Sequence, residues 1–264
     1  MSNSLIVRWL GQMPYQEAWD LQEQLAGEIA EGRQPPTLLL LEHPHTFTFG
    51  RRGRAENLLW EQEELEQRGV QVFWVDRGGD VTYHGPGQLV GYPLLPLAPG
   101  GLYVEAQSGK KRLPQADYVG YLRRLEDMLI QALFSLGVAG AQMPGLTGVW
   151  VQPDVFSRCL RCPPNMRRKP AKIAAIGVKV DARGVSRHGF ALNVDPDMSY
   201  WDGIIGCGIQ DYPIASLADL LQPVPDMQQV RQAVIQAFSE EFNYQIIEEI
   251  RPISGSSDEQ RFDT

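Results

Sequence analysis

The chain has 264 residues, 43% of them hydrophobic, with 24 lysines and arginines against 32 aspartates and glutamates, which gives a formal net charge of −8. A chain of this length and apolar content can bury a complete core unaided, so disorder and a disulfide-stabilised miniprotein are excluded. The acidic total argues against a general nucleic-acid binder, and three cysteines do not suggest a secreted disulfide framework.

The first part of the chain predicts strands interspersed with one long helix. The expected elements are, in chain order, a strand at 6–10, a helix at 15–30, strands at 37–41 and 45–50, a helical segment at 58–67, and strands at 70–75 and 89–95. Apolar side chains recur at helical spacing in the long helix, and Gly32 and Pro35 end that pattern. Between the last two strands lies glycine-rich sequence, which we expect to be a loop.

The second part predicts a further sheet segment between two helices. The expected elements are a loop at 97–113, a helix at 117–136, a strand at 147–151, an irregular stretch at 153–170, strands at 173–180 and 189–194, and a helix at 226–242. The first of these helices has Asp117 as its N-cap and Gly137 at the C′ position, with an apolar stripe that begins at Val119 and ends at Leu136.

These elements predict an α/β (α+β) protein, because helices and strands are mixed without the regular alternation of a doubly wound parallel sheet. We expect one domain over residues 1–253 and a disordered polar tail over residues 254–264. The apolar run at residues 5–7 is too short for a signal peptide and Arg8 interrupts it. No stretch approaches the roughly 18 apolar residues of a membrane span. We therefore expect a cytoplasmic protein with no membrane or nucleic-acid partner.

The densest unusual sequence is RGGDVTYHGPGQ, from Arg77 to Gln88. Glycines at these positions let the backbone turn sharply and approach a ligand. A glycine-proline turn between two strands uses similar residues, so both interpretations stay open. The segment is neither a dinucleotide fingerprint nor a phosphate-binding P-loop.

Two further segments carry groups capable of chemistry. KIAAIGVKV, which starts at Lys172, and HGFALNV, which starts at His188, together predict a β-hairpin in which either residue is a surface or structural group or a site residue. In GIIGCGI, Cys207 is flanked by glycines. Core cysteines normally lie among larger apolar residues, so Cys207 is either a buried inert thiol or an accessible nucleophile with backbone N–H groups nearby.

The other cysteines form a C-x-x-C pair, Cys159 and Cys162. Such a pair supplies half of a tetrahedral zinc site, which His43 and His45 could complete. It is also consistent with a redox-sensitive pair or with two ordinary thiols.

Taken in order, RGGDVTYHGPGQ, GVWV, K-I-x-x-I-G, HGFALNV and the glycine-flanked cysteine resemble the lipoyl(octanoyl) transferases, the lipoate-protein ligase B type, over roughly residues 7–221. LEHPHTFTFGRR, from Leu41 to Arg52, is similar to the N-terminal His-Pro segment of that family. The resemblance implies a mixed-sheet catalytic domain of the biotin/lipoate transferase-ligase type with a small C-terminal subdomain.

The resemblance also implies roles for individual residues. Cys207 matches the nucleophile that accepts the octanoyl group as a thioester, and Lys172 matches the lysine that activates this thiol. Free thiols have a pKa of about 8.5, and a neighbouring ammonium group favours the reactive thiolate. The residues that match substrate-binding segments are Arg77, Gly78, Gly79, Asp80, Val81, Thr82, Tyr83, His84, Ala175, Ile176, Gly177, Gly189, Phe190 and Ala191.

The implied reaction moves an octanoyl group from acyl carrier protein to Cys207 and then to a lysine of a lipoyl domain, as the first step of endogenous lipoate biosynthesis. The implied recipients are the lipoyl domains of 2-oxoacid dehydrogenases and the glycine cleavage H protein. No cofactor or metal is expected, because a thioester is already activated. Two alternatives remain: an ATP-dependent lipoate or biotin ligase on the same fold, which does not need Cys207, and a non-catalytic protein that binds acyl carrier protein or lipoyl domains.

This chain departs from the family pattern in two places. Gly206 stands where the family commonly has proline before the reactive cysteine. The stretch between Val151 and Lys172 is longer than the usual short turn, and its basic residues are Arg158, Arg161, Arg167, Arg168 and Lys169. A basic loop beside the site would attract an acidic carrier protein; an ordinary solvated loop is the alternative.

Overall fold

The computed structural model describes residues 3–105, 111–112, 117–156, 159, 164, 166–206 and 212–249. Its centre is an eight-stranded sheet with the strand order β13-β1-β2-β6-β12-β11-β10-β9. The strands are β1 (Ser4–Gln12), β2 (Thr37–Glu42), β6 (Gln88–Leu94), β9 (Gly140–Met143), β10 (Leu146–Val151), β11 (Ala171–Val180), β12 (Ser186–Asn193) and β13 (Gln245–Glu249). Strand β1 pairs in parallel with β2 and β13, and the other pairs are antiparallel. The mixed sheet confirms the predicted fold class.

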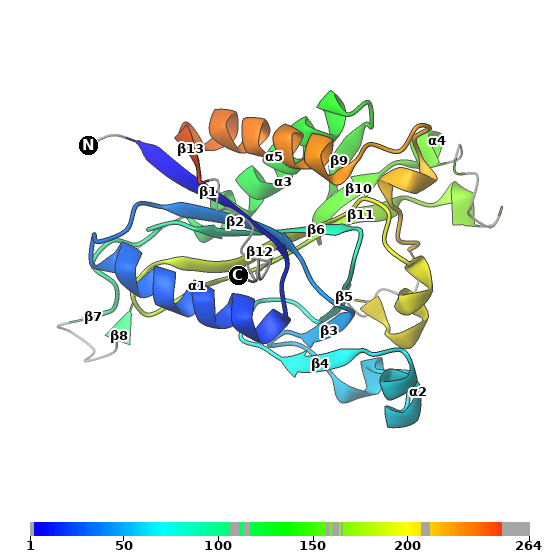
Figure 1. Cartoon of the computed structure of the whole chain (residues 1–264), viewed down its shortest axis with the longest axis horizontal. Coiled ribbons are helices and arrows are strands. Elements are labelled where there is room, and N and C mark those ends of the chain that lie inside the picture. Colours follow the sequence, from blue (N-terminus) through cyan, green and yellow to red (C-terminus); the bar gives the residue numbers. More distant parts are fainter. Residues whose placement is uncertain are drawn as a thin grey trace, which may run out of the picture.

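Helices cover both faces of this sheet (Figure 1). Helix α1 (Tyr15–Ala30) lies on one face, and helices α3 (Tyr118–Ser135) and α5 (Met227–Phe242) lie together on the other. Strand β2 shows why two layers form, because successive side chains of a strand point to opposite faces. Leu39 and Leu41 pack with α1, whereas Leu38 and Leu40 pack in the cluster that contains α3 and α5.

Helix α3 begins at the predicted cap, and α5 begins after Asp226, the first residue of the helix expected there. The Asp117 carboxylate accepts a hydrogen bond from the Gly120 N–H at 2.6 Å, and Asp226 forms a capping box with Gln229. The expectation that Val119 belongs to the buried stripe of α3 is wrong, since it is 67% exposed; the stripe begins at Tyr121, one turn into the helix. The expected C-terminal subdomain corresponds to α5 and β13, and α5 shares one hydrophobic cluster with α3.

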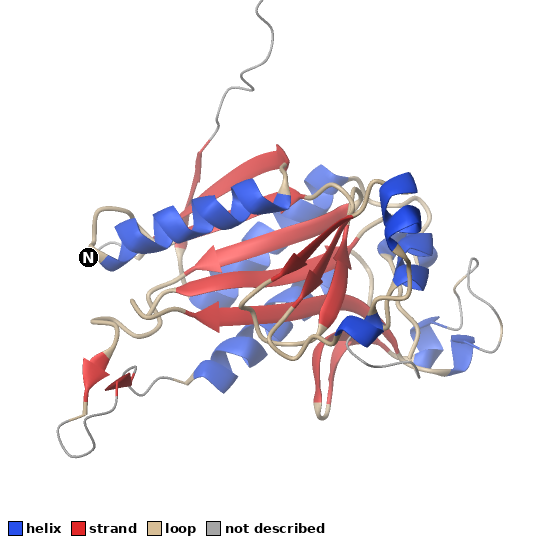
Figure 2. Cartoon of the chain, turned by 90° about the horizontal axis from the view of Figure 1, so that it is seen from below, coloured by secondary structure: helices blue, strands red, loops and turns tan. Residues whose placement is uncertain are grey.

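A smaller sheet lies at one end of the large one, in the order β4-β3-β5 (Figure 2). It consists of β3 (Thr46–Phe49), β4 (Gln71–Trp74) and β5 (Val81–His84), and it packs near helix α2 (Gln62–Gln67) and the short helices η1 (Ala55–Asn57) and η3 (Met198–Gly203). Strand β5 corrects the expectation of a loop over the whole glycine-rich segment. Its residues are good strand formers, and the glycines that suggested a loop lie outside them.

The sequence patterns missed several other short elements. Strands β9 and β13 were not predicted, and the expected loop at 97–113 contains strands β7 (Tyr103–Val104) and β8 (Lys111–Arg112). The expected irregular stretch at 153–170 contains α4 (Pro153–Phe156) and η2 (Met166–Arg168), and η5 (Leu217–Asp219) precedes α5. The predicted tail at 254–264 lies outside the described residues. Within the described ranges, no helix is both long and apolar enough to cross a membrane.

Candidate active site

Three cavities meet at the end of the large sheet that faces the small one. The largest is an open cleft of about 670 Å³, whose lining includes Lys172, Ile176 and Gly177 from β11. A narrow cavity lies against the paired strands β11 and β12 and shares Gly79, Ile176 and Gly177 with this cleft. A third, small cavity contains Lys172 and shares Thr82 and Ala175 with the narrow one. Lys172 therefore lies between the open cleft and the small cavity, and Thr82 lies between the small cavity and the narrow one.

Lys172 lies in strand β11 with only 8% of its surface exposed, so the interpretation as a solvated surface lysine is wrong. Its ammonium nitrogen lies 5.4 Å from the centre of the Trp150 ring on the neighbouring strand. The pairing of β10 with β11 shifts register at this point, because Val149 pairs with Ala174 while Trp150 pairs with Lys172. Such a bulge bends a strand locally and re-aims its side chains, here next to the cavities.

Gly148 makes the space that the Lys172 side chain occupies. It adopts a positive φ of +118°, and a Cβ at this position would lie 2.6 Å from Cε of Lys172. The Gly148 N–H donates a hydrogen bond of 2.9 Å to the carboxylate of Glu126, which is fully buried in α3 and also pairs with Arg123 at 2.6 Å. Helix α3 thus fixes the backbone against which Lys172 rests.

The four residues of strand β5, at the centre of the glycine-rich segment, point alternately to two opposite sides. Thr82 and His84 point to the cavity side, and both line the narrow cavity. Val81 and Tyr83 point the other way, into the hydrophobic cluster of the small sheet. Alternation along a strand explains this division, and it separates four residues that the family resemblance grouped together.

The residues just before this strand, Arg77 to Asp80, form part of the wall of the open cleft or support it. The buried Arg77 guanidinium donates to the Thr48 carbonyl at 2.6 Å and to the Gly78 carbonyl at 2.9 Å. Gly78, Gly79 and Asp80 line the open cleft. The Asp80 carboxylate accepts from the Asn57 amide at 2.7 Å, which ties the segment to η1.

The hairpin β11–β12 supplies the walls of the narrow cavity. Ala175 pairs with Ala191, Ile176 with Phe190, and Gly177 with Gly189, and all six of these residues line the cavity. The walls of the cavity are apolar or small at these positions, which suits an extended hydrocarbon chain; burial of such a chain contributes about 0.8 kcal/mol per CH₂ group.

The inner part of the narrow cavity is lined by Tyr15, Tyr92, His84 and His188. Burial lowers the pKa of His84 well below its usual range and also lowers the pKa of His188. His43 lies behind this group, between the Met13 carbonyl and the Tyr92 hydroxyl, each at 2.7 Å, and burial lowers its pKa to about 4. Burial thus disfavours the charged form of all three imidazoles.

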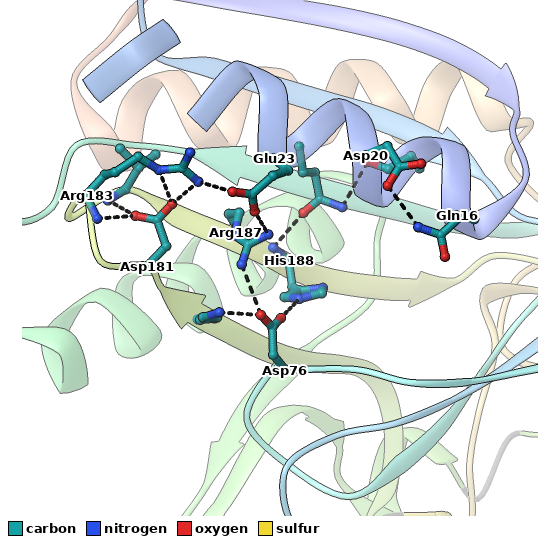
Figure 3. Close-up of polar contacts among 12 residues, drawn as sticks. Gln16, Asp20, Glu23, Asp76, Asp181, Arg183, Arg187 and His188 are labelled. Atoms are coloured by element: carbon teal, nitrogen blue, oxygen red, sulfur yellow. Dashed lines mark hydrogen bonds and ion pairs between the residues drawn. The ribbon is translucent and has the colours of Figure 1, made fainter. Parts of the chain in front are cut away.

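A network of charges holds His188 and the start of the glycine-rich segment together (Figure 3). The Asp76 carboxylate accepts from His188 at 2.8 Å, from Arg187 at 3.0 Å, and from Lys179. Glu23 on α1 lies between Arg183 and Arg187. The hydrogen bond from His188, followed by those of Lys179 and the charge of Arg187, holds the pKa of Asp76 far below its usual range.

Cys207 lies outside the described residues, but the residues on either side of its segment are described. Gly206 and Tyr212 line the small cavity together with Lys172. The backbone after the segment is bound to the same lysine, because the Lys172 N–H donates to the Pro213 carbonyl and the Ala215 N–H donates to the Lys172 carbonyl, both at 2.9 Å. Residues far apart in the sequence are thus brought to one cavity.

Of the C-x-x-C pair, for which a zinc site, a redox-sensitive pair and two ordinary thiols were left open, the structure describes only Cys159. Cys159 is fully buried and disulfide-bonded, so it is not an ordinary free thiol. A disulfide sulfur is not the thiolate that zinc requires, so Cys159 in this state is no zinc ligand. Cys162 lies outside the described residues, as do Arg158 and Arg161. Arg167, Arg168 and Lys169 lie just before β11, and the last two are exposed.

Several residues that line the cavities were not predicted as site residues from the sequence. Tyr15 and Tyr92 reach the narrow cavity from α1 and β6, and Arg52 and Arg54 line the open cleft from the turn after β3. The glycine-arginine pattern after the His-Pro segment was the signal available for the arginines. No local signal marked the tyrosines, because each belongs to the ordinary apolar pattern of its element.

Comparison with known proteins gives the family. The model of the lipoyl protein ligase A/B catalytic domain matches residues 14–239. An octanoyltransferase of Chloroflexus aurantiacus is 44% identical over 239 residues, which is 90% of this chain and 94% of that protein. An octanoyltransferase of Rubrobacter xylanophilus is 41% identical over 231 residues, or 87% and 90% of the two chains.

Solved structures agree at the level of the fold. A bipartite lipoate protein ligase from Thermoplasma acidophilum, studied with its E2 lipoyl domain, has a TM-score of 0.63 at 17% identity and covers 96% of this chain and 88% of that one. A lipoate-protein ligase A bound with ATP has a TM-score of 0.61 at 16% identity, with 96% and 90% covered. Together with the sequence relatives, these findings show that the chain belongs to the lipoyl protein ligase A/B catalytic-domain family and is an acyltransferase.

Proposed function

We propose that this protein transfers an octanoyl group from acyl carrier protein to a lysine of a lipoyl domain, through a thioester on Cys207. The observation that carries the proposal is the position of Lys172, which is buried between the open cleft and a cavity bordered by Gly206, the residue before Cys207. The octanoyltransferase relatives support the acyl group, because they match most of the chain.

In the first step the Cys207 thiolate adds to the carbonyl carbon of the octanoyl thioester. The carbonyl π electrons move to oxygen, and their return expels the thiolate of the carrier, which takes up the proton of the Lys172 ammonium group and leaves this lysine neutral. Lys172 favours the attacking thiolate through its positive charge. The octanoyl chain lies in the narrow cavity against β11 and β12, along the small and apolar residues of that hairpin.

In the second step the amine of the recipient lysine adds to the Cys207 thioester. The amine must lose a proton as the amide forms, and Lys172 in its neutral form accepts it. Cys207 leaves as a thiolate and is ready for the next cycle. No group other than the two substrates and the protein is needed to balance the reaction.

The open cleft is the entrance for both partners. Arg52 and Arg54 line it, and Arg167, Arg168 and Lys169 lie beside β11, which forms one wall. These cations attract an acidic carrier protein even though the whole chain has a net charge of −8. Lipoyl domains, among them those of 2-oxoacid dehydrogenases and the glycine cleavage H protein, are the proposed recipients.

The test is the intact mass of the purified protein after incubation with octanoyl carrier protein. We expect an octanoyl adduct on the wild type, none on Cys207→Ser, and loss of the adduct with gain of the same mass on an added lipoyl domain. Octanoyl-pantetheine serves as a donor without the carrier protein, and we expect it to react more slowly and with less dependence on salt. Transfer from free octanoate that requires ATP would instead show a ligase, and binding without transfer would show a non-catalytic module.

A further inference from the structure

The Thr82 hydroxyl is buried and, within the described part of the chain, has no hydrogen-bond partner. Thr82 is only 6% exposed. Buried polar groups in folded proteins almost always have a partner, so an exception in a native site needs a reason. Thr48, which pairs with Thr82 on the neighbouring strand β3, is different, because its hydroxyl accepts a hydrogen bond from Arg77 at 2.9 Å.

The position of Thr82 gives the reason. It lines both the narrow cavity, where the acyl chain is proposed to lie, and the small cavity that contains Lys172 and Gly206. Ala175, across from it on β11, lines the same two cavities. A carbonyl group that joins an acyl chain in one cavity to a sulfur or amine in the other must pass this junction.

The walls of the small cavity are rich in donors. Besides Thr82, the cavity is lined by Trp150 and Trp201, whose indole N–H groups are also buried and without a partner among the described residues. Lys172 adds a positive charge at the same place. Donors without partners and a cation around one cavity match what a developing oxyanion requires.

We propose that Thr82 is a catalytic residue whose hydroxyl donates a hydrogen bond to the carbonyl oxygen of the transferred acyl group. This proposal rests on the proposed acyl transfer. When the nucleophile adds to the carbonyl carbon, the π electrons move to this oxygen and the hydrogen bond strengthens. When the leaving thiolate departs, the carbonyl bond forms again and the hydroxyl keeps its proton throughout. Thr82 thus acts in both steps.

Two substitutions separate the hydroxyl from the shape of the side chain. Thr82→Val keeps the shape and removes the hydroxyl, whereas Thr82→Ser keeps the hydroxyl and removes a methyl group. We expect Thr82→Val to lower kcat about a hundredfold with octanoyl carrier protein and a lipoyl domain, with KM little changed. Its Tm should equal or exceed that of the wild type, because a buried unpaired hydroxyl is lost. Thr82→Ser should keep kcat within a few-fold.

The opposite pattern would overturn the proposal: Thr82→Val active within threefold of the wild type, or Thr82→Ser impaired as much as Thr82→Val. A structural role predicts that opposite pattern, because only the methyl group would then matter. This comparison needs octanoyl transfer alone, so it stands even if no thioester on Cys207 is found and that part of the proposed function fails. Absence of any octanoyl transfer by the wild type would overturn both.

A spectroscopic measurement tests the contact itself. The infrared carbonyl stretch of a [1-¹³C]octanoyl group bound to the protein should shift to lower frequency in the wild type and in Thr82→Ser, and return toward the free thioester value in Thr82→Val. The same frequency in all three proteins would show that the hydroxyl does not contact the carbonyl, and would overturn the proposal.

Discussion

Strand β11 carries two lysines whose surroundings differ in kind. Lys179 binds the Asp76 carboxylate at the far end of the hairpin, in a network where the charges of Arg187 and Glu23 are also paired. Lys172, seven positions earlier, faces the ring of Trp150 and the backbone of Gly148 and lines two cavities. The paired charges hold the scaffold in place. Lys172 lines cavities that a substrate can enter, and the small cavity is also lined by Thr82, Trp150 and Trp201, whose donors have no hydrogen-bond partner among the described residues.

The largest expected effect on kcat comes from replacing one of the two lysines by alanine, each in a separate variant. Lys172→Ala should lower kcat for octanoyl transfer about a thousandfold, because a charge beside the nucleophile and a proton acceptor are both lost. Lys179→Ala is the matched control on the same strand and should stay within about threefold. Steady-state rates with octanoyl carrier protein measure both. Equal losses would place both lysines in the scaffold and remove the contrast.

A smaller effect is expected from closing the space next to Lys172. Gly148→Ala puts a methyl group 2.6 Å from the present position of Lys172 Cε, and the displaced ammonium group should lower kcat about tenfold to a hundredfold. Gly137→Ala is the control, since Gly137 also has a positive φ, of +88°, but no atom within 4 Å of the new Cβ. Urea unfolding should show a loss of about 1 kcal/mol in Gly137→Ala and a larger loss in Gly148→Ala, because its Cβ would also lie 2.5 Å from the Ala174 carbonyl oxygen. Equal activity in both would show that the Lys172 position is not critical.

The smallest effect concerns the network and is seen in stability. Asp76→Asn removes the carboxylate that receives three hydrogen bonds, and should lower the unfolding free energy by about 1–2 kcal/mol at pH 7. The pKa of Asp76 is depressed in the folded state, so its contribution is present above the unfolded pKa of about 3.9 and is lost as the pH falls through the folded pKa.

Urea titrations of wild type and Asp76→Asn across the acid range measure this dependence: the two curves should begin to approach each other below about pH 4 and should meet only as the pH falls through the folded pKa of Asp76. Glu23→Gln provides the comparison, because Glu23 is 53% exposed and its ion pairs contribute less. A larger loss for Glu23→Gln, or curves that stay parallel into acid, would contradict the assignment.

The spacing of apolar residues was sufficient to predict the helices whose ends are marked by capping or helix-ending residues in the local sequence. Helix α1 has the predicted bounds, and α3 begins at the Asp117 cap. The same reasoning failed for β5, where neighbouring glycines masked three good strand residues, and for β13, which is held by pairing with the other end of the chain. Local patterns do not contain such distant partners.

The candidate site divides in the same way. The glycine-rich segment could be singled out because an unusual local sequence marks it, whereas Lys172 was assigned to the site only through the family resemblance. The roles of Glu126 and Tyr15 could not, since a buried carboxylate in a helix and an apolar tyrosine acquire their meaning only from Gly148 and the narrow cavity, which come from other elements. Thr82 was included with its segment, but its separation from Val81 and Tyr83 needed the strand that the sequence did not predict.

The pairing of β1 with β13 has a consequence for how the chain reaches its fold. Arg8 on β1 and Glu249 on β13 form an ion pair across 241 residues of sequence, so the outer edge of the large sheet is completed by a segment that is synthesised long after β1. Until then one side of β1 presents unpaired N–H and C=O groups, which invite pairing with other chains. Contacts of such long range also slow folding. We expect the nascent protein to be most prone to aggregation just before β13 emerges.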